Sequence, residues 1–200
     1  VAGFAGADIT FSQGTKLNAH SGNTYNMLVV KLDSSGNVSW YTFLGGTTGG
    51  EQASSIQQTS DGGYIVAGYA TASISSLQGK TPLNAYSSGY DMLVVKLDSS
   101  GNVAWYTFLG GTATEWPKSV QQTSDGGYIV AGRAESNISP PQGTRINPYT
   151  HYSDMLIVKL DSSGNVAWYT FLGGAENDGA YSIRQTADGG YIVAGYAQAD

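Results

Sequence analysis

The segment Met27–Gly46 reads MLVVKLDSSGNVSWYTFLGG, and the chain contains it three times. The second copy, MLVVKLDSSGNVAWYTFLGG, spans Met92–Gly111, and the third, MLIVKLDSSGNVAWYTFLGG, spans Met155–Gly174. In each copy, two runs of aliphatic, β-branched and aromatic residues flank an Asp-Ser-Ser-Gly-Asn turn, which predicts an antiparallel hairpin. Because internal repetition of this strength determines the architecture, we interpret the rest of the chain relative to it.

A second block repeats in step with the first. SIQQTSDGGYIVAG occupies Ser55–Gly68, and close copies occupy Ser119–Gly132 and Ser182–Gly195. Its Asp-Gly-Gly predicts another tight hairpin turn, since Asp-Gly supplies the positive-φ positions that such turns need. Counted on the Val-Ala-Gly triplet, the repeats begin at Val1, Val66, Val130 and Val193, in steps of 65, 64 and 63 residues. We therefore expect residues 1–200 to be a single three-repeat segment, part of a larger tandem array or assembly.

Each repeat predicts four strands and no helix. In one repeat the expected strands are Ser55–Thr59, Tyr64–Tyr69, Met92–Leu97 and Val103–Leu109. The last two strands are apolar on both faces, which favours sheets that pack on both neighbours. Without the insertion of about 20 residues between the second and third strands, each repeat keeps about 44 residues, near the length of a propeller blade. The expected fold is all-β, a β-propeller of four-stranded antiparallel blades.

These motifs resemble a known family. Lys-Leu-Asp-Ser-Ser-Gly-Asn-Val-x-Trp, followed by Gly-Gly and then by Ser-Ile-Gln-Gln-Thr-Ser-Asp-Gly-Gly-Tyr-Ile-Val-Ala-Gly, is similar to the bacterial β-propeller repeats of secreted and cell-surface proteins. The resemblance covers all three copies outside the insertions. It implies a propeller fold and an extracellular or cell-surface location. It supplies no shared set of catalytic residues, and the long insertions depart from the compact blade of the family.

Composition excludes several classes of partner. The 200 residues include 9 Lys and Arg against 15 Asp and Glu, a net charge of −6, so no basic surface exists to bind nucleic acid. No cysteine is present, which excludes disulfides and thiolate metal sites. Apolar runs such as Met27–Val30 are far shorter than the ~20 residues that cross a bilayer. We expect neither a nucleic-acid partner nor a membrane span.

The sequence offers little for catalysis. Its two histidines, His20 and His151, lie in the insertions and form no metal or triad pattern. Three acidic residues precede the first strand of successive repeats and leave two alternatives, an acidic ring that attracts a cation or simple solvation of a loop: Glu51, Glu115 and Asp178. We favour solvation and expect no catalytic residue, no metal and no cofactor. A glycan-active enzyme is the last alternative.

The insertions carry their own repeated signature of amides and aromatic rings. Such side chains hold sugars by hydrogen bonds and ring stacking, but they also order a loop against a neighbouring blade. We favour the ordered loop and retain carbohydrate or protein binding as the alternative function. The candidate binding residues are Gln13, Asn18, His20, Gln78, Asn84, Tyr86, Gln142, Asn147 and Tyr149.

Three repeats are fewer than the four to eight blades that usually close a propeller. Each outer blade would then expose an apolar face, and such faces mark interfaces. The fourth strand of each repeat also has no charge or proline to protect its edge. We therefore expect a structural, self-associating protein whose partners are other copies, in a ring or a filament. Its predicted assembly surface comprises Trp40, Tyr41, Phe43, Trp105, Tyr106, Phe108, Trp168, Tyr169 and Phe171.

Overall fold

A computed structural model describes residues 1–22, 24–138, 140 and 142–199. Within this part of the chain all regular structure is β, which confirms the predicted fold class. No helix there is long and apolar enough to cross a membrane. The strands are β1 (Ala2–Ala5), β2 (Thr15–Asn18), β3 (Asn26–Leu32), β4 (Val38–Leu44), β5 (Glu51–Gln58), β6 (Tyr64–Ala70), β7 (Asp91–Leu97), β8 (Val103–Leu109), β9 (Glu115–Gln122), β10 (Tyr128–Ala134), β11 (Thr144–Arg145), β12 (Asp154–Leu160), β13 (Val166–Leu172), β14 (Asp178–Gln185) and β15 (Tyr191–Ala197).

The strands form four sheets. The first has the order β1-β3-β4-β2, the second β5-β6-β7-β8, the third β9-β10-β12-β13-β11, and the fourth β14-β15. The second sheet reproduces the four predicted antiparallel strands in sequence order. Its first strand begins at Glu51 rather than at Ser55, because a register shift between Ala53 and Ser55 lets the strand continue past the irregularity. Gly68 lies opposite this shift, where a Cβ would stand 2.0 Å from the Gln52 carbonyl oxygen.

Both predicted turns form, and their polar residues explain them. In the turn after β7, Asp98 Oδ1 accepts hydrogen bonds from Ser100 N and Asn102 N, each at 2.9 Å. Gly101 in that turn has a φ of +86°, a conformation that glycine adopts without strain. The residues of the repeated Asp-Ser-Ser-Gly-Asn motif therefore stabilise the turn, as the sequence predicts.

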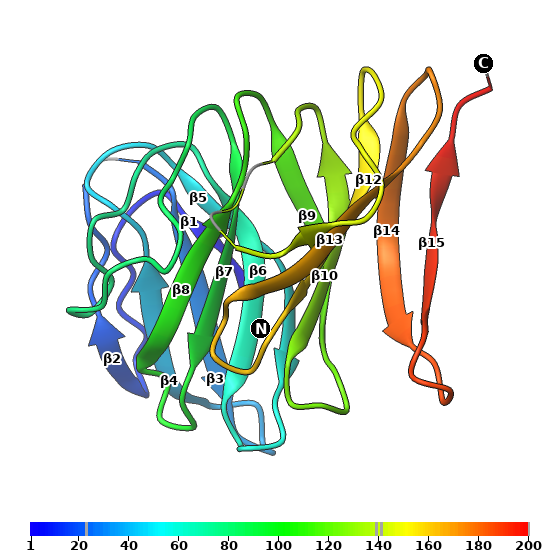
Figure 1. Ribbon diagram of the computed structural model, residues 1–200. Helices are drawn as coiled ribbons and strands as arrows, with labels where there is room; N and C mark the ends of the chain where they lie inside the picture. The colour runs from blue at the N-terminus through cyan, green and yellow to red at the C-terminus, as the bar shows by residue number, and fades with distance from the viewer. Residues whose placement is uncertain (23, 139, 141, 200) are drawn as a thin grey trace.

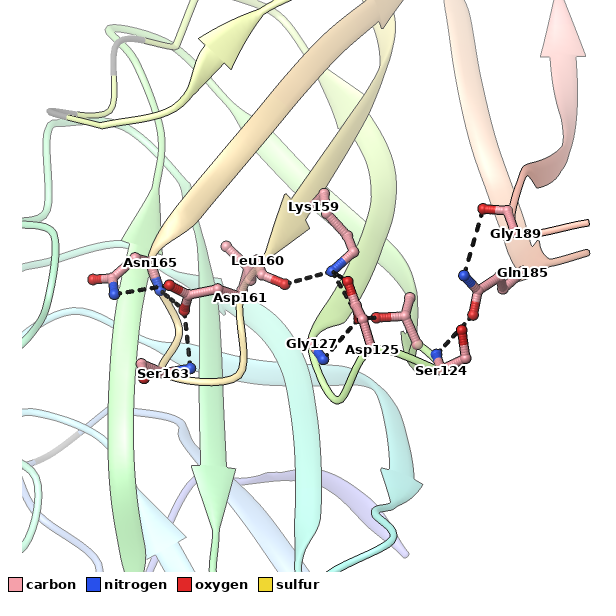
Figure 2. A network of polar contacts seen from close by, with 11 residues as sticks. Ser124, Asp125, Gly127, Lys159, Leu160, Asp161, Ser163, Asn165, Gln185 and Gly189 are labelled. Carbon is pink, nitrogen blue, oxygen red and sulfur yellow. Dashed lines mark hydrogen bonds and ion pairs between the residues drawn. The ribbon is translucent and has the colours of Figure 1, made fainter.

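The turn between the first two strands of a sheet is tied to the third strand by a nearly buried lysine. Lys159 Nζ lies 2.9 Å from Asp125 Oδ2 and also donates to the Leu160 carbonyl at 3.0 Å (Figure 2). Lys96 makes the same pair with Asp61 at 2.8 Å. Thr123 and Lys159, both hydrogen-bonded to the Asp125 carboxylate, lower its pKa. The pairs fix the hairpin turns on their sheets.

The insertions complete the outer edge of the sheets. β2 pairs in parallel with β4, and β11 pairs in parallel with β13. In the second sheet the insertion makes the same backbone contacts, from Leu83 N to Tyr106 O at 2.9 Å and from Phe108 N to Asn84 O at 3.3 Å. The prediction that the fourth strand of each repeat has an unprotected edge is therefore wrong, because each repeat covers that edge with its own insertion.

The four sheets stand side by side in the order of the chain, from β1–β4 at one end to β14–β15 at the other (Figure 1). An apolar layer fills each of the three spaces between neighbours. Met27, Val66 and Leu93 belong to the layer between the first and second sheets, and Ile65 and Val130 to the next layer. The described residues form an open row and no closed ring, so the closed propeller is not confirmed.

Candidate functional site

Neighbouring sheets are joined by a repeated hydrogen bond between their first strands. Gln57 Oε1 in β5 accepts from Gln122 N in β9 at 2.6 Å. Gln121 Oε1 in β9 accepts from Gln185 N in β14 at 3.0 Å. The second and third sheets therefore each offer a side-chain acceptor to the next sheet at the same position.

A second repeated bond runs in the opposite direction. Gln122 Oε1 accepts from Ser60 N at 2.7 Å, and Gln185 Oε1 accepts from Ser124 N at 2.8 Å; Figure 2 shows the second of these bonds. Each glutamine therefore holds the hairpin turn of the preceding sheet. The equivalent residue of the second sheet, Gln58, is exposed. These glutamines are thus among the polar contacts that join neighbouring sheets.

At the last sheet, the glutamine that accepts a hydrogen bond from the following sheet is replaced by an arginine. Arg184 stands in β14 where β5 has Gln57 and β9 has Gln121. A guanidinium group has only donors, so Arg184 offers no acceptor to a backbone N–H beyond the fourth sheet. Its Nη1 instead donates to the carbonyl of Ile183 at 3.3 Å.

The aromatic residues predicted as an assembly surface lie mostly inside the stack. Six of them are buried, which corrects that prediction: Tyr41, Phe43, Tyr106, Phe108, Tyr169 and Phe171. The remaining three are half-buried and pack edge-on against a tyrosine of the next sheet, with ring centroids 5.6 Å apart in each case: Trp40 on Tyr64, Trp105 on Tyr128, and Trp168 on Tyr191. The correction has a physical reason, since each ring is covered by an insertion or by a neighbouring sheet.

The strand β15 exposes apolar side chains whose equivalents in the earlier sheets are buried. Ile65 and Ile129 are 0 % exposed because each packs into the layer shared with the following sheet. Ile192 holds the same position in β15 and is 63 % exposed. Ala194, the equivalent of the buried Ala67, is also exposed. The outer face of the fourth sheet is therefore an open copy of an interface that is closed twice within the chain.

The opposite end of the row carries the complementary face. Leu28 and Val30 in β3 are half-buried, whereas their equivalents Leu93 and Val95 are buried against the first sheet. Phe11, from the first insertion, packs against this face and stacks edge-on with Tyr41 at 4.8 Å. The outer face of the first sheet is thus only partly covered.

The predicted binding residues of the insertions hold those insertions on their own sheets. Asn84 Nδ2 donates to Thr107 Oγ1 at 2.8 Å, and Asn147 Nδ2 donates to Thr170 Oγ1 at 3.0 Å. Gln78 Oε1 accepts from Val103 N at 2.7 Å. Three more have contacts within their insertion or sheet: Asn18 with the Phe43 carbonyl, Tyr86 with the Gly89 carbonyl, and Tyr149 with the Tyr152 carbonyl.

The structure groups some of these residues but not all. Asn84 and Tyr86 line one hollow of about 410 Å³, and Asn18 and Gln78 line another of about 260 Å³. His20 contacts the Ala5 carbonyl at 3.2 Å and the Phe43 ring, at a centroid distance of 5.5 Å. Gln13 and Gln142 lie on exposed parts of their insertions. No single site unites the nine residues.

The three acidic residues expected before the first strands are instead the first residues of β5, β9 and β14, and all three are buried. Each carboxylate accepts a hydrogen bond from a glycine N–H of the preceding turn: Glu51 from Gly46, Glu115 from Gly111, and Asp178 from Gly174. Both sequence alternatives, the cation ring and the solvated loop, are therefore wrong. Among the described residues, no three His, Cys, Asp or Glu side chains gather as metal ligands.

A residue at the start of the third strand faces each of these carboxylates. In the first pair, Asn26 Nδ2 donates to Glu51 Oε2 at 3.3 Å. In the second pair the amide is replaced by Asp91, whose Oδ1 is buried and has no hydrogen-bond partner in the described part of the chain. Burial raises the pKa of Asp91 to about 6 and that of Glu115 to about 7. The second pair therefore consists of two buried carboxyl groups whose pKa values lie near neutral pH.

Comparisons with known proteins add no assignment. No family model matches the chain, and no curated protein matches it. The resemblance to bacterial surface repeats therefore stays an expectation.

The sequence analysis missed the contacts that join the sheets. The Gln-Gln-Thr that recurs at Gln57–Thr59 and Gln121–Thr123 is the signal that identifies them, because a surface strand needs no paired amides at a fixed position. It also missed Ile192 as an exposed residue, since the identical Tyr-Ile-Val-Ala-Gly is buried in the earlier copies.

Proposed function

We propose that the chain is a non-enzymatic structural repeat module in which each sheet acts as one blade of a propeller-like stack. Further units of the same kind cover its two outer faces. The observation that carries the proposal is the contrast between Ile65 and Ile129, which are 0 % exposed, and Ile192, which is 63 % exposed in the same sequence context. Burying one such side chain contributes about 1.5–3 kcal/mol, which favours a further unit at that face.

The outer face of the first sheet and the outer face of the fourth sheet correspond to the two sides of the interfaces between sheets inside the chain. Ile192 corresponds to residues that pack against a following sheet, and Leu28 and Val30 correspond to residues that pack against a preceding sheet. A unit added to either end would thus repeat an interface that the chain already contains. Such head-to-tail joining gives a ring if the rotation closes and a filament if it does not. The extracellular or cell-surface location that the resemblance implies is part of the same proposal.

Sedimentation equilibrium of the 200-residue chain tests the proposal. We expect the average mass to rise with concentration over the micromolar range. Ile192→Lys should hold the chain at the monomer mass, because a charge on the outer face cannot enter an apolar layer without a partner. The matched control is Ile146→Lys, on an insertion, where Ile146 is 59 % exposed. This control should associate like the unchanged chain.

Two results would contradict the proposal. One is a monomer mass at every concentration up to the solubility limit. The other is an equal effect of Ile192→Lys and Ile146→Lys, which would assign association to general surface hydrophobicity rather than to the outer face of the fourth sheet.

A further inference from the structure

An aromatic row crosses all four sheets near one end of the stack, where the second strands finish and the third strands begin. Its members come from different repeats and are not conspicuous in the sequence, because no position of the band is tyrosine in every copy: Arg133 stands at the position of Tyr69, and Ser153 at that of Tyr90. We call this row the aromatic band; it consists of Tyr25, Tyr69, Tyr90, Trp116, Tyr181 and Tyr196.

Rings of the band contact one another within a sheet and, in one pair, across a sheet boundary. Tyr69 and Tyr90 have ring centroids 5.3 Å apart, and Tyr90 lies 5.9 Å from Trp116 of the next sheet. The Arg133 guanidinium lies over this indole, 4.5 Å from its centroid. The row continues on the fourth sheet with the ring pair Tyr181 and Tyr196, 5.5 Å apart.

These rings differ from the aromatic residues of the apolar layers. Tyr106 is 0 % exposed, but Tyr25, Tyr90 and Tyr181 keep 52 %, 39 % and 59 % of their surface in solvent. The hydroxyls of Tyr25 and Tyr90 form no hydrogen bond with the residues that the structure describes. The band therefore presents ring surfaces and free hydroxyls together, as ligand sites often do.

Between the first and second sheets the band lines a groove of about 400 Å³. The side chains around it are hydroxyls, ring faces and one amide, without a charged or aliphatic member, and two glycines complete the wall. The six side chains are Thr24, Tyr25, Gln52, Tyr69, Thr71 and Tyr90.

We propose that this groove binds a neutral oligosaccharide, with sugar rings against the tyrosines and sugar hydroxyls on Gln52, Thr71 and the tyrosine hydroxyls. The side chains that line the groove favour one class of ligand over the others. A nucleic acid or an anionic sugar would need a cation, and the groove has none. A lipid tail would need aliphatic walls. A hydroxyl-rich ligand with apolar C–H faces matches both components of the lining.

The backbone around the groove is held in place before a ligand arrives. Glu51 N donates to the Tyr25 carbonyl at 2.8 Å, and Glu115 N donates to the Tyr90 carbonyl at 2.6 Å. Both bonds connect a band tyrosine to the following sheet. Because the backbone of both tyrosines is hydrogen-bonded to a neighbouring sheet, binding loses little conformational freedom.

A second groove makes a chain of sugars a better fit than a single sugar. It measures about 180 Å³ and lies between the third and fourth sheets, lined by the band residues Trp116, Tyr181 and Tyr196. Lys118 and Arg133 also line it, so the second groove has cationic side chains, which the first groove lacks. The contacts of Tyr90 with Trp116 connect the two grooves along the band.

Isothermal titration of the 200-residue chain with four neutral hexasaccharides tests the proposal: cellohexaose, xylohexaose, laminarihexaose and mannohexaose. We expect at least one to bind. Tyr90→Ala should then weaken binding about tenfold, because it removes the burial of one ring face. Tyr90→Phe keeps the ring and should weaken binding by a smaller factor, which separates stacking from a folding defect.

Tyr152→Ala is the matched control, since Tyr152 lies on an insertion, is 66 % exposed and lines neither groove, so it should leave binding within about twofold. The proposal is overturned if no hexasaccharide binds, or if Tyr152→Ala weakens binding as much as Tyr90→Ala does. A proline-rich peptide titrated in parallel supplies the competing result, because binding of that peptide without any sugar would assign the groove to a protein partner. None of these outcomes depends on self-association.

Discussion

Two strands of this protein have the same seven residues, Tyr-Ile-Val-Ala-Gly-Tyr-Ala, and different surroundings. In β6 the segment lies between two sheets, and its four central residues are buried. In β15 the same segment lies on the last sheet, and four of its seven residues are exposed. The position of the sheet in the stack, rather than the local sequence, thus determines whether these residues are buried and contribute to stability.

This contrast shows how the stability of the molecule is distributed. A sheet that cannot cover both of its apolar faces depends on its neighbours, so stability is a sum of contacts between adjacent sheets, as in other repeat proteins. The same substitution should therefore have different effects in equivalent positions of β6 and β15. Four predictions test or refine this comparison.

The largest difference is expected at the isoleucine of the repeated segment. Ile65→Ala removes a buried side chain and should cost about 2–5 kcal/mol, whereas Ile192→Ala in the exposed copy should cost less than about 0.5 kcal/mol. Urea denaturation followed by circular dichroism, at a concentration that keeps the chain monomeric, measures both. Equal losses would show that the fourth sheet is covered in solution.

The acid pair gives the next effect, and it depends on pH. The folded-state pKa values of Glu115, about 7, and Asp91, about 6, lie above the ordinary values of 4.5 and 3.8, because burial disfavours the charged forms. Between about pH 4 and about pH 7, the folded state therefore binds more protons than the unfolded state. The free energy of unfolding consequently falls as the pH rises from about 4 to about 7.

Asp91→Asn should therefore raise the melting temperature at pH 8 and change it little at pH 4, because it copies the amide that Asn26 supplies in the first pair. The reverse substitution, Asn26→Asp, should lower the melting temperature at pH 8. Thermal melts across this pH range test both. A loss of stability in Asp91→Asn at pH 8 would contradict the acid-pair interpretation and point to a bound cation.

A smaller effect is expected for the glutamine contacts between sheets. Gln121→Ala removes the acceptor for Gln185 N and should cost about 0.5–1.5 kcal/mol. Gln58→Ala, at an exposed position, should change stability by less than about 0.5 kcal/mol. Denaturant titration of the two variants distinguishes a structural contact from a surface amide, and similar values would remove the proposed role of the Gln-Gln motif.

The smallest effect on stability is expected at Arg184. Arg184→Gln restores the acceptor that Gln57 and Gln121 provide in the earlier sheets, so it should leave the monomer unchanged. It should, however, strengthen association severalfold, because a further unit then gains one hydrogen bond. Sedimentation equilibrium provides the measurement, and unchanged or weaker association would show that the stack does not grow from this face.

The sequence predicts the strands of this fold well, because the repeat supplies the same pattern three times. Val103–Leu109 has the predicted bounds, and Tyr64–Tyr69 differs from β6 by one residue. It did not predict β2 or β11, since Thr15–Asn18 and Thr144–Arg145 are short and have no alternating pattern. Their pairing is decided by contact with a strand more than 20 residues away in the chain.

The surfaces were harder to predict than the strands. Tyr41 and Phe43 alternate with other apolar residues, and the sequence does not show whether a neighbouring sheet, an insertion or solvent covers each side. The aromatic band was missed for a different reason. Tyr69 and Arg133 occupy equivalent positions in β6 and β10, so a search for repeated residues passes over a row assembled from different residue types.

Hydrogen exchange of β15, compared with β10 in the same sample, is the most direct test of the claim that further units cover the outer faces. The account predicts fast exchange in residues 191–197 and slow exchange in residues 128–134 at low concentration. As the concentration rises, exchange in residues 191–197 should slow toward that of residues 128–134. Exchange in residues 191–197 that stays fast at every concentration would contradict the account.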